Sequence, residues 1–410
     1  MKLRLVLGFV SSLWLGCGDP VCGNQKTEDG EQCDDGNQTN GDGCEVTCQN
    51  TPLTCGNGII DVGELCLVAP VVVPVGAFPN AVVVGNFDDD PKPDLAVSNG
   101  GDETIGILIN DREGNNPFID QQILPLQPGE STASLAVGDF DGDGRDELAA
   151  VEFNNQQLLV FEVFFNGTLQ VNLQQTIPSI EALFSVDVAD LDEDSFLDLF
   201  TPDIQGGSAF FGQVGGTFET TPVSFNTGIF PNEMISVELN GDNLLDLVTT
   251  DSTDNVSVFL NQGNRAFQKL GSFAVVDNPG DIASGDFNED SGLDFVTANV
   301  GSDDAGILLG SGGGTLDVAT NLGVGDFPLS VAVGDLNADG FDDFVVANSD
   351  SNNVSLFLGK GDGTFETPQA LEVGTQPVDL LLADFTEDGV LDLVVVNRGS
   401  AQLSFFAQKP

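Results

Sequence analysis

Carboxylates recur along this 410-residue chain at a spacing that could bind a hard cation. The stretch GDFDGDGRDEL, Gly138 to Leu148, has five acidic side chains in nine residues from Asp139. In the pattern D-x-D-x-D-G-x-x-D/E, positions 1, 3, 5 and 9 converge on one point when a glycine at position 6 permits a sharp turn. Calcium takes about six to eight oxygen ligands, so a bound ion would turn the mutual repulsion of these carboxylates into coordination.

Related acidic loops follow one another through the rest of the chain. They begin at Asn86, Asp139, Asp190, Glu238, Asp286, Asp335 and Asp384, at steps of 53, 51, 48, 48, 49 and 49 residues. The predicted calcium ligands are Asn86, Asp88, Asp90 and Asp94; Asp139, Asp141, Asp143 and Glu147; Asp190, Asp192, Asp194 and Asp198; Asp286, Asn288, Asp290 and Asp294; Asp335, Asn337, Asp339 and Asp343; and Asp384, Asp388 and Asp392. Two loops match less well, because Pro91 cannot reach positive φ and Glu238 is longer than the expected aspartate. Acidic turns without a metal are the alternative.

The segments around each loop have the length and pattern of β-strands. Runs such as SLAVG before a loop, and DLVVVN and VSLFLG after one, are apolar or alternate with period two, between Gly, Asn and Asp. Turns that end at Phe118, Leu169, Phe218, Phe267, Leu316 and Phe365 lie 19 to 21 residues before the next loop. Four antiparallel strands per repeat, taken seven times, predict an all-β fold, a seven-bladed β-propeller. A β-helix would need a shorter repeat, and a helical solenoid would need a 3.6-residue period.

The ends of the repeat region predict how the ring closes. The last repeat stops at LSFFAQKP, where its outermost strand should begin. The segment LVAPVVVPVG, from Leu67, has the corresponding spacing from the first acidic loop. We therefore expect this segment to complete the seventh blade, which would leave no unpaired edge at the seam.

The seven in-phase acidic loops resemble the FG-GAP or VCBS-type repeat of integrin α-subunit propellers and of many secreted bacterial proteins. The resemblance covers residues 67–410. It implies calcium-binding loops on one face of the propeller and partner contacts on the opposite face, that is, a binding, adhesion or scaffold protein.

The first residues are typical of an export signal. Lys2 and Arg4 precede an apolar run from Leu5 to Leu15 that is too short to span a bilayer. The run ends at Cys17, in a sequence that resembles the lipobox of bacterial lipoproteins. This resemblance implies that residues 1–16 are removed and that Cys17 is lipidated, which would anchor the protein at the outer membrane or cell surface. An ordinary signal peptide followed by an unpaired cysteine is the alternative.

Residues 17–66 are predicted to form a small disulfide-rich segment. Apart from Cys17, the cysteines are Cys22, Cys33, Cys44, Cys48, Cys55 and Cys66, an even number suited to an oxidising compartment. Zinc is disfavoured, since the chain has no histidine and no C-x2-C pair. The spacing resembles the myxobacterial cysteine-rich repeat, with a truncated second copy. By this analogy Cys55 pairs with Cys66, Cys22 with Cys33, and Cys44 with Cys48, although the sequence permits other connectivities.

Composition narrows the possible functions and partners. The formal net charge is -54, with 65 acidic and 11 basic residues, which excludes a basic groove for nucleic acid or anionic lipid. With no histidine, no tyrosine and no cysteine after residue 66, the propeller lacks common catalytic groups, so we do not expect an enzyme.

We expect a monomer that binds a protein or glycan at the cell surface and contacts the membrane only through its lipid anchor. A polysaccharide-binding lectin or a carbohydrate-active enzyme is the alternative, although the single tryptophan, Trp14, lies in the export signal.

Overall fold

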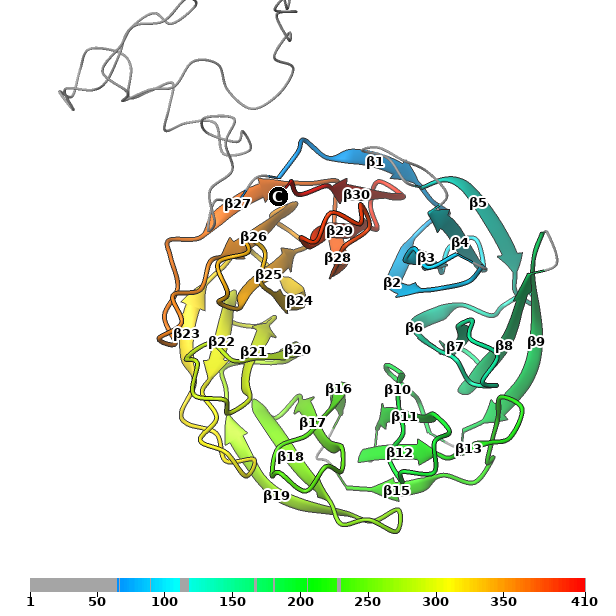
Figure 1. Cartoon of the computed structure of the whole chain (residues 1–410), viewed down its shortest axis with the longest axis horizontal. Helices are drawn as coiled ribbons and strands as arrows, with labels where there is room; N and C mark the ends of the chain where they lie inside the picture. The colour runs from blue at the N-terminus through cyan, green and yellow to red at the C-terminus, as the bar shows by residue number, and fades with distance from the viewer. Residues whose placement is uncertain are drawn as a thin grey trace, which may run out of the picture.

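The computed structural model describes residues 65 and 67–409, apart from residues 89, 111–117, 166–167, 180, 205 and 227–229. Seven four-stranded antiparallel sheets are arranged around a common axis (Figure 1). The all-β, seven-bladed propeller predicted from the repeat is therefore confirmed. The export signal, Cys17 and the six cysteines predicted to form disulfides lie outside the described residues. No helix in the described part of the chain is long and apolar enough to cross a membrane.

Each blade is a meander that runs outward from the axis. From innermost to outermost strand, the first three blades are β2 (Pro79–Gly85), β3 (Asp94–Asn99), β4 (Thr104–Asn110) and β5 (Phe118–Pro125); β6 (Thr132–Gly138), β7 (Glu147–Glu152), β8 (Gln157–Phe165) and β9 (Leu169–Pro178); and β10 (Asp187–Ala189), β11 (Asp198–Asp203), β12 (Gly206–Phe210) and β15 (Val223–Phe225). Blade 3 also has a two-stranded hairpin, β13 (Gly212–Gln213) with β14 (Thr217–Phe218).

The remaining blades follow the same order. They are β16 (Pro231–Val237), β17 (Asp246–Asp251), β18 (Asn255–Asn261) and β19 (Phe267–Ala274); β20 (Pro279–Gly285), β21 (Asp294–Asn299), β22 (Asp304–Leu308) and β23 (Thr320–Gly323); β24 (Pro328–Gly334), β25 (Asp343–Asn348), β26 (Asn353–Phe357) and β27 (Gln369–Glu372); and β28 (Pro377–Ala383), β29 (Asp392–Asn397), β30 (Gln402–Phe406) and β1 (Val71–Pro74). The second strand of every blade is buried along its whole length. Both of its faces therefore contribute to the core.

The ring closes as the sequence predicts. Strand β1 pairs antiparallel with β30, with Val71 opposite Phe405 and Pro74 opposite Gln402. An isolated bridge between Leu67 and Gln408 extends the contact. Blade 7 thus combines the last three strands of the chain with a strand that precedes blade 1 (Figure 1).

Phenylalanines from two points of the repeat meet between neighbouring blades. In each acidic loop the second residue is Phe or Leu. The rings of Phe140, Phe287 and Phe385 contact those of Phe218, Phe365 and Phe118, respectively, each of which ends the outer turn of the next blade. The ring centroids of Phe140 and Phe218 are 5.2 Å apart, and those of Phe118 and Phe385 are also 5.2 Å apart, both edge to face. Such contacts stabilise the blade interfaces beyond the area that they bury. The periodic phenylalanines are therefore core residues, as the sequence indicates.

Polar side chains join the innermost strands in what we call the inner belt: Asp187, Glu233, Asp281, Ser330 and Asp379. Asp379 Oδ2 accepts the N–H of Val82 (2.8 Å), and Asp281 Oδ2 accepts the N–H of Val331 (2.9 Å), so each bond crosses to the next blade. Ser330 Oγ donates to Asp379 Oδ1 at 3.1 Å. Burial raises the pKa of Asp281 to about 7 and that of Asp379 to about 6, and it raises the pKa of Glu233 well above its usual range.

Candidate calcium sites and the opposite face

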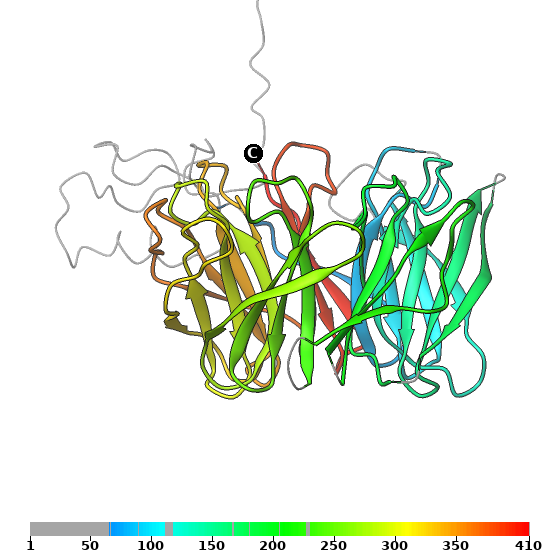
Figure 2. The same cartoon turned by 90° about the horizontal axis from the view of Figure 1, so that it is seen from below.

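The acidic loops all open on one face of the propeller. Acidic loops 1–7, numbered by blade, each connect the innermost strand to the second strand, and position 9 is the first residue of that second strand. The outer turns, which connect the third and fourth strands, lie on the same face because the strands alternate in direction (Figure 2). The turns between second and third strands lie on the opposite face.

Backbone hydrogen bonds hold the acidic side chains of a loop in place. In acidic loop 2, Asp139 Oδ1 accepts the N–H groups of Gly142 (2.7 Å) and Asp143 (3.0 Å), and its Oδ2 accepts that of Gly144 (3.0 Å). Asp141 Oδ1 also accepts the N–H of Asp143. In loops 3, 5, 6 and 7, the carboxylate at position 1 likewise accepts the N–H groups of positions 5 and 6, which are Asp143 and Gly144 in loop 2. These bonds fix the orientation of the first carboxylate in each of these loops, and sequence reasoning did not anticipate them.

The sharp turn at position 6 forms with or without glycine. Gly144 has φ +92°, and Gly340 and Gly389 have φ +91° and +90°. Ser195 and Ser291 adopt the same left-handed region at +71° and +67°. Because that region is unfavourable for residues with a Cβ, the serines cost stability that the glycines do not.

Two acidic loops bring three carboxylates together. Within the described residues, one ligand oxygen from each of Asp139, Asp141 and Glu147 lies within 4.8 Å of the other two, and so do oxygens of Asp190, Asp192 and Asp194. Asp143, predicted as a ligand in loop 2, instead forms an ion pair with Arg145. The predicted ligand Asp198 is not part of the loop 3 group.

At position 9, six of the seven loops use the carboxylate to join backbone segments. One oxygen accepts the N–H of position 2, and the other accepts an N–H at or just beyond the end of the third strand. In loop 5, for example, Asp294 Oδ2 bonds Phe287 (2.9 Å) and Oδ1 bonds Gly310 (2.7 Å). The others are Asp94, Asp198, Asp246, Asp343 and Asp392. Their part in coordination stays a prediction.

Glu147 is the exception. Its Oε2 accepts the N–H of Phe140 at 2.8 Å, whereas its Oε1 is buried and has no hydrogen-bond partner among the described residues. The side chain is 1% exposed, and burial raises the pKa of Glu147 to about 8. An orphaned buried oxygen beside two carboxylates fits the donor set of a calcium ion. Acidic loop 2 is therefore the best-formed candidate calcium site.

The other loops are less complete. Further buried oxygens without a partner in the described chain stand at ligand positions of loops 1, 3 and 7: Asn86 Oδ1, Asp192 Oδ1 and Thr386 Oγ1. In loop 6, the amide of Asn337 donates to Asp339 Oδ2 at 2.9 Å, which uses two of the predicted ligands. In loop 4, Glu238 Oε1 accepts three N–H groups of its own loop, including that of Gly241 at 2.6 Å. This contact explains how the longer side chain is accommodated there.

The face opposite the acidic loops displays large aromatic side chains. Phe78, Phe230 and Phe327 directly precede innermost strands, and Phe153 directly follows a second strand. They are 61%, 49%, 43% and 50% exposed, respectively. We call this surface the aromatic face. Exposed aspartates accompany the rings: Asp303 Oδ1 accepts the N–H of Phe327 at 2.9 Å.

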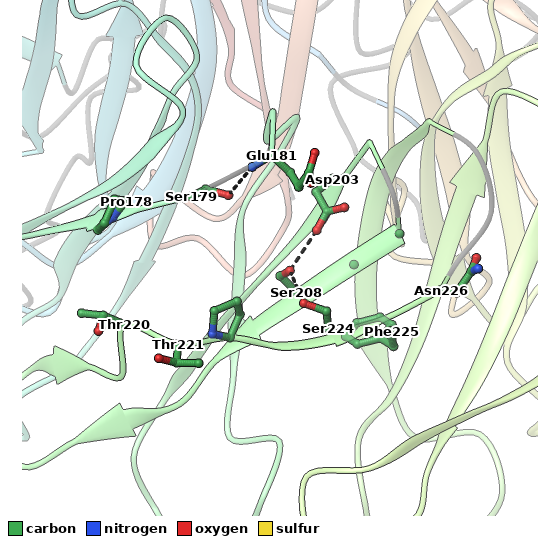
Figure 3. A pocket seen from close by; sticks show the side chains of 13 residues that line it. Pro178, Ser179, Glu181, Asp203, Ser208, Thr220, Thr221, Ser224, Phe225 and Asn226 are labelled. Carbon is green, nitrogen blue, oxygen red and sulfur yellow. Dashed lines mark hydrogen bonds between the residues drawn. The ribbon is translucent and has the colours of Figure 1, made fainter.

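A pocket of about 440 Å³ lies beside blade 3, between the end of β9 and strand β15. Figure 3 shows a row of hydrogen bonds in its wall: Ser208 Oγ is 2.9 Å from Asp203 Oδ2 and 3.2 Å from Ser224 Oγ. Blade 4 has the same row, formed by Asp251, Ser257 and Ser272. These bonds are therefore part of the repeat rather than special to the pocket.

The fold and its loops define a class of protein: a β-propeller built from acidic-loop repeats. The family described as FG-GAP-like repeat matches residues 86–150 and 335–395, and a domain of unknown function, DUF4215, matches residues 11–49. The chain therefore carries FG-GAP-like repeats in a seven-bladed propeller, and the second match is consistent with a cysteine-rich N-terminal segment.

Similar folds occur in solved structures of distant sequence. BBS1N in complex with ARL6DN is 11% identical, with a TM-score of 0.57, over 83% of this chain and 98% of that chain. The BP39L lectin from Burkholderia pseudomallei is 17% identical, with a TM-score of 0.52, over 73% and 86%. At such identities the likeness shows the fold alone. No curated protein matches the sequence.

Proposed function

We propose that this protein is a calcium-stabilised, lipid-anchored propeller outside the cytoplasm that binds a protein partner through its aromatic face. The observation that supports binding is the exposure of Phe78, Phe153, Phe230 and Phe327 on one face of a rigid ring. Exposed aromatic side chains cost solvation free energy and are frequent anchors of protein interfaces. The nearby aspartates favour a partner that combines apolar and basic residues.

Calcium would support binding indirectly. The candidate ligands lie at the end of the innermost strands remote from the aromatic face, so calcium would stiffen the ring rather than contact the partner. No catalytic step is part of this proposal.

Site-specific photo-crosslinking on intact cells tests the binding face. A benzophenone amino acid replaces Phe78 or Phe327 in one set of variants, and Asp362 in the matched control. Asp362 is exposed in the outer turn of blade 6, on the face of the acidic loops. We expect a discrete crosslinked partner from the two phenylalanine positions and none from Asp362. Equal crosslinking from both faces, or none from either, would contradict the proposal.

Glycan binding is the second candidate, because the pocket beside blade 3 is lined by hydroxyl and carboxylate side chains among apolar surface and is large enough for one or two sugar rings. Thr221 lines the pocket and is exposed, so Thr221→Trp should fill it without disturbing the core. A glycan array decides the matter: signal that disappears in Thr221→Trp supports this candidate, and absence of signal leaves the protein partner.

A further inference from the structure

In blades 3, 5 and 6, the outer turn approaches the acidic loop of the preceding blade. In blade 5 the N–H of Gly313 donates to the carbonyl of Leu239 in loop 4 (3.0 Å), and in blade 6 the N–H of Gly363 donates to that of Phe287 in loop 5 (2.8 Å). A Cβ on Gly216, in the outer turn of blade 3, would stand 3.2 Å from Cβ of Asp141 in loop 2. Gly314, which follows Gly313 and is equivalent to Gly216 and Gly363, would place a Cβ 3.6 Å from Cδ1 of Leu239 in loop 4. The residue at this position of the turn thus faces the neighbouring acidic loop.

Blade 4 has an arginine where these turns have a glycine. Gly216, Gly314 and Gly363 have φ values of +70°, +77° and +78°, and Arg265, at the same point, has +61°. A side chain makes this left-handed backbone unfavourable, so Arg265 needs compensating contacts.

The contacts of Arg265 are with acidic loop 3 and its surroundings. Its Nε lies 2.6 Å from Asp192 Oδ2, and its Nη2 lies 4.0 Å from Asp194 Oδ2. Its Nη1 donates to Glu219 at 2.8 Å, and the guanidinium carbon stands 4.0 Å from the ring centroid of Phe211. Carboxylates therefore bind the nitrogens at the edge of the guanidinium, and an aromatic ring packs against its face.

Asp192 and Asp194 belong to one of the two carboxylate groups with the geometry for a cation. The positive charge of Arg265 already offsets their repulsion, and it would oppose a divalent ion at the same place. Loop 2, in contrast, faces Gly216, which brings no charge, and its own Arg145 pairs with Asp143, which lies outside the group of Asp139, Asp141 and Glu147. We infer that Arg265 serves acidic loop 3 as a tethered cation in place of calcium, so that loop 3 keeps its shape when calcium is withdrawn. This inference rests on the proposed calcium binding of the acidic loops.

Calcium titration of the full mature protein tests the inference. Arg265→Gly introduces the residue found in the turns of blades 3, 5 and 6 and relieves the strained backbone. Asp192 Oδ1 is buried with no partner in the described structure, so the loop would keep an oxygen available for the ion. We expect Arg265→Gly to bind one more calcium per chain than wild type, and the double variant Arg265→Gly/Asp192→Asn to lose that addition.

Hydrogen exchange in EDTA supplies a second measurement. In wild type, residues 190–198 should stay protected while residues 139–147 exchange at least tenfold faster than in calcium. In Arg265→Gly, residues 190–198 should become calcium-dependent as well.

The outcomes separate this inference from the proposed function. Wild type that loses a calcium on Asp192→Asn alone would overturn the inference, because loop 3 would then hold calcium beside Arg265. An unchanged count in a folded Arg265→Gly would also overturn it. If wild type binds no calcium but Arg265→Gly binds one, the inference stands and calcium stabilisation of the native protein fails.

Discussion

Two substitutions at position 9 of different acidic loops should have opposite effects. At about pH 9, above the raised pKa of Glu147, Glu147→Gln removes a buried charge whose Oε1 has no hydrogen-bond partner in the described chain. The amide that replaces this oxygen can donate to Asp139 or Asp141. Because an unsatisfied buried polar group costs roughly 1–3 kcal/mol, the variant should be more stable than wild type by about that amount in EDTA.

Calcium should narrow or cancel this difference. A site with a dissociation constant of about 0.1–1 mM, usual for extracellular modules, stabilises the fold by about 1–2 kcal/mol at about 5 mM calcium. Glu147→Gln should lose that increment, since the amide nitrogen cannot coordinate the ion.

The matched control is Asp294→Asn. Both oxygens of Asp294 accept backbone N–H groups. In Asp294→Asn, the side-chain NH2 group would therefore point at one of these N–H groups, with two donors opposed and no acceptor. We expect a loss of about 2–3 kcal/mol that is the same in EDTA and in calcium. Urea denaturation of the four combinations gives the free energies. A calcium increment in Glu147→Gln as large as that of wild type, or an increment in Asp294→Asn smaller than that of wild type, would refute the reasoning.

Three further predictions concern the seam, the inner belt and the anchor. Val73→Asp puts a carboxylate at a position that is 3% exposed in β1 and should cost about 3 kcal/mol or more in urea denaturation, whereas Val72→Asp, at 52% exposure, should cost little. Because the native pKa of Glu233 is raised, the native state binds protons that the unfolded chain does not, and stability should fall as pH rises from 5 to 8. Glu233→Gln should raise the melting temperature at pH 8 and leave it nearly unchanged at pH 5. Cys17→Ser should move the protein from the detergent to the aqueous phase, and an aqueous wild type would refute the lipid anchor.

The repeat made the fold predictable because each of its markers has one physical role. The spacing of the acidic loops sets the blade length, the phenylalanines mark the blade interface, and the apolar segment from Leu67 has the length and position of a closing strand. Irregular features of single blades were less accessible. The innermost strand of blade 3 has three residues where those of the other blades have seven, and this depends on local packing that the period does not encode.

The ligand sets were only partly predictable, because the motif does not reveal what else each oxygen bonds. Aspartate at position 9 reaches two backbone N–H groups, whereas the extra methylene of Glu147 leaves one oxygen free of such a bond; the sequence shows both simply as acids. Arg265 was a different case. Alignment of the outer turns would have revealed an arginine among glycines, but only the three-dimensional structure shows which loop it contacts.

The closing strand also determines when the protein can finish folding. Val71 and its partner Phe405 are separated by about 330 residues, so β1 has no partner until almost the whole chain has left the ribosome. Until then the nascent protein is an open arc in which the sheet face of blade 1 that packs on blade 7 and the edge of β1 are both bare and liable to contact other chains. Any truncation before β30 would leave the arc open permanently. Closure of the seam therefore acts as a check on completeness: a protease or chaperone that recognises exposed edges would distinguish whole molecules from fragments.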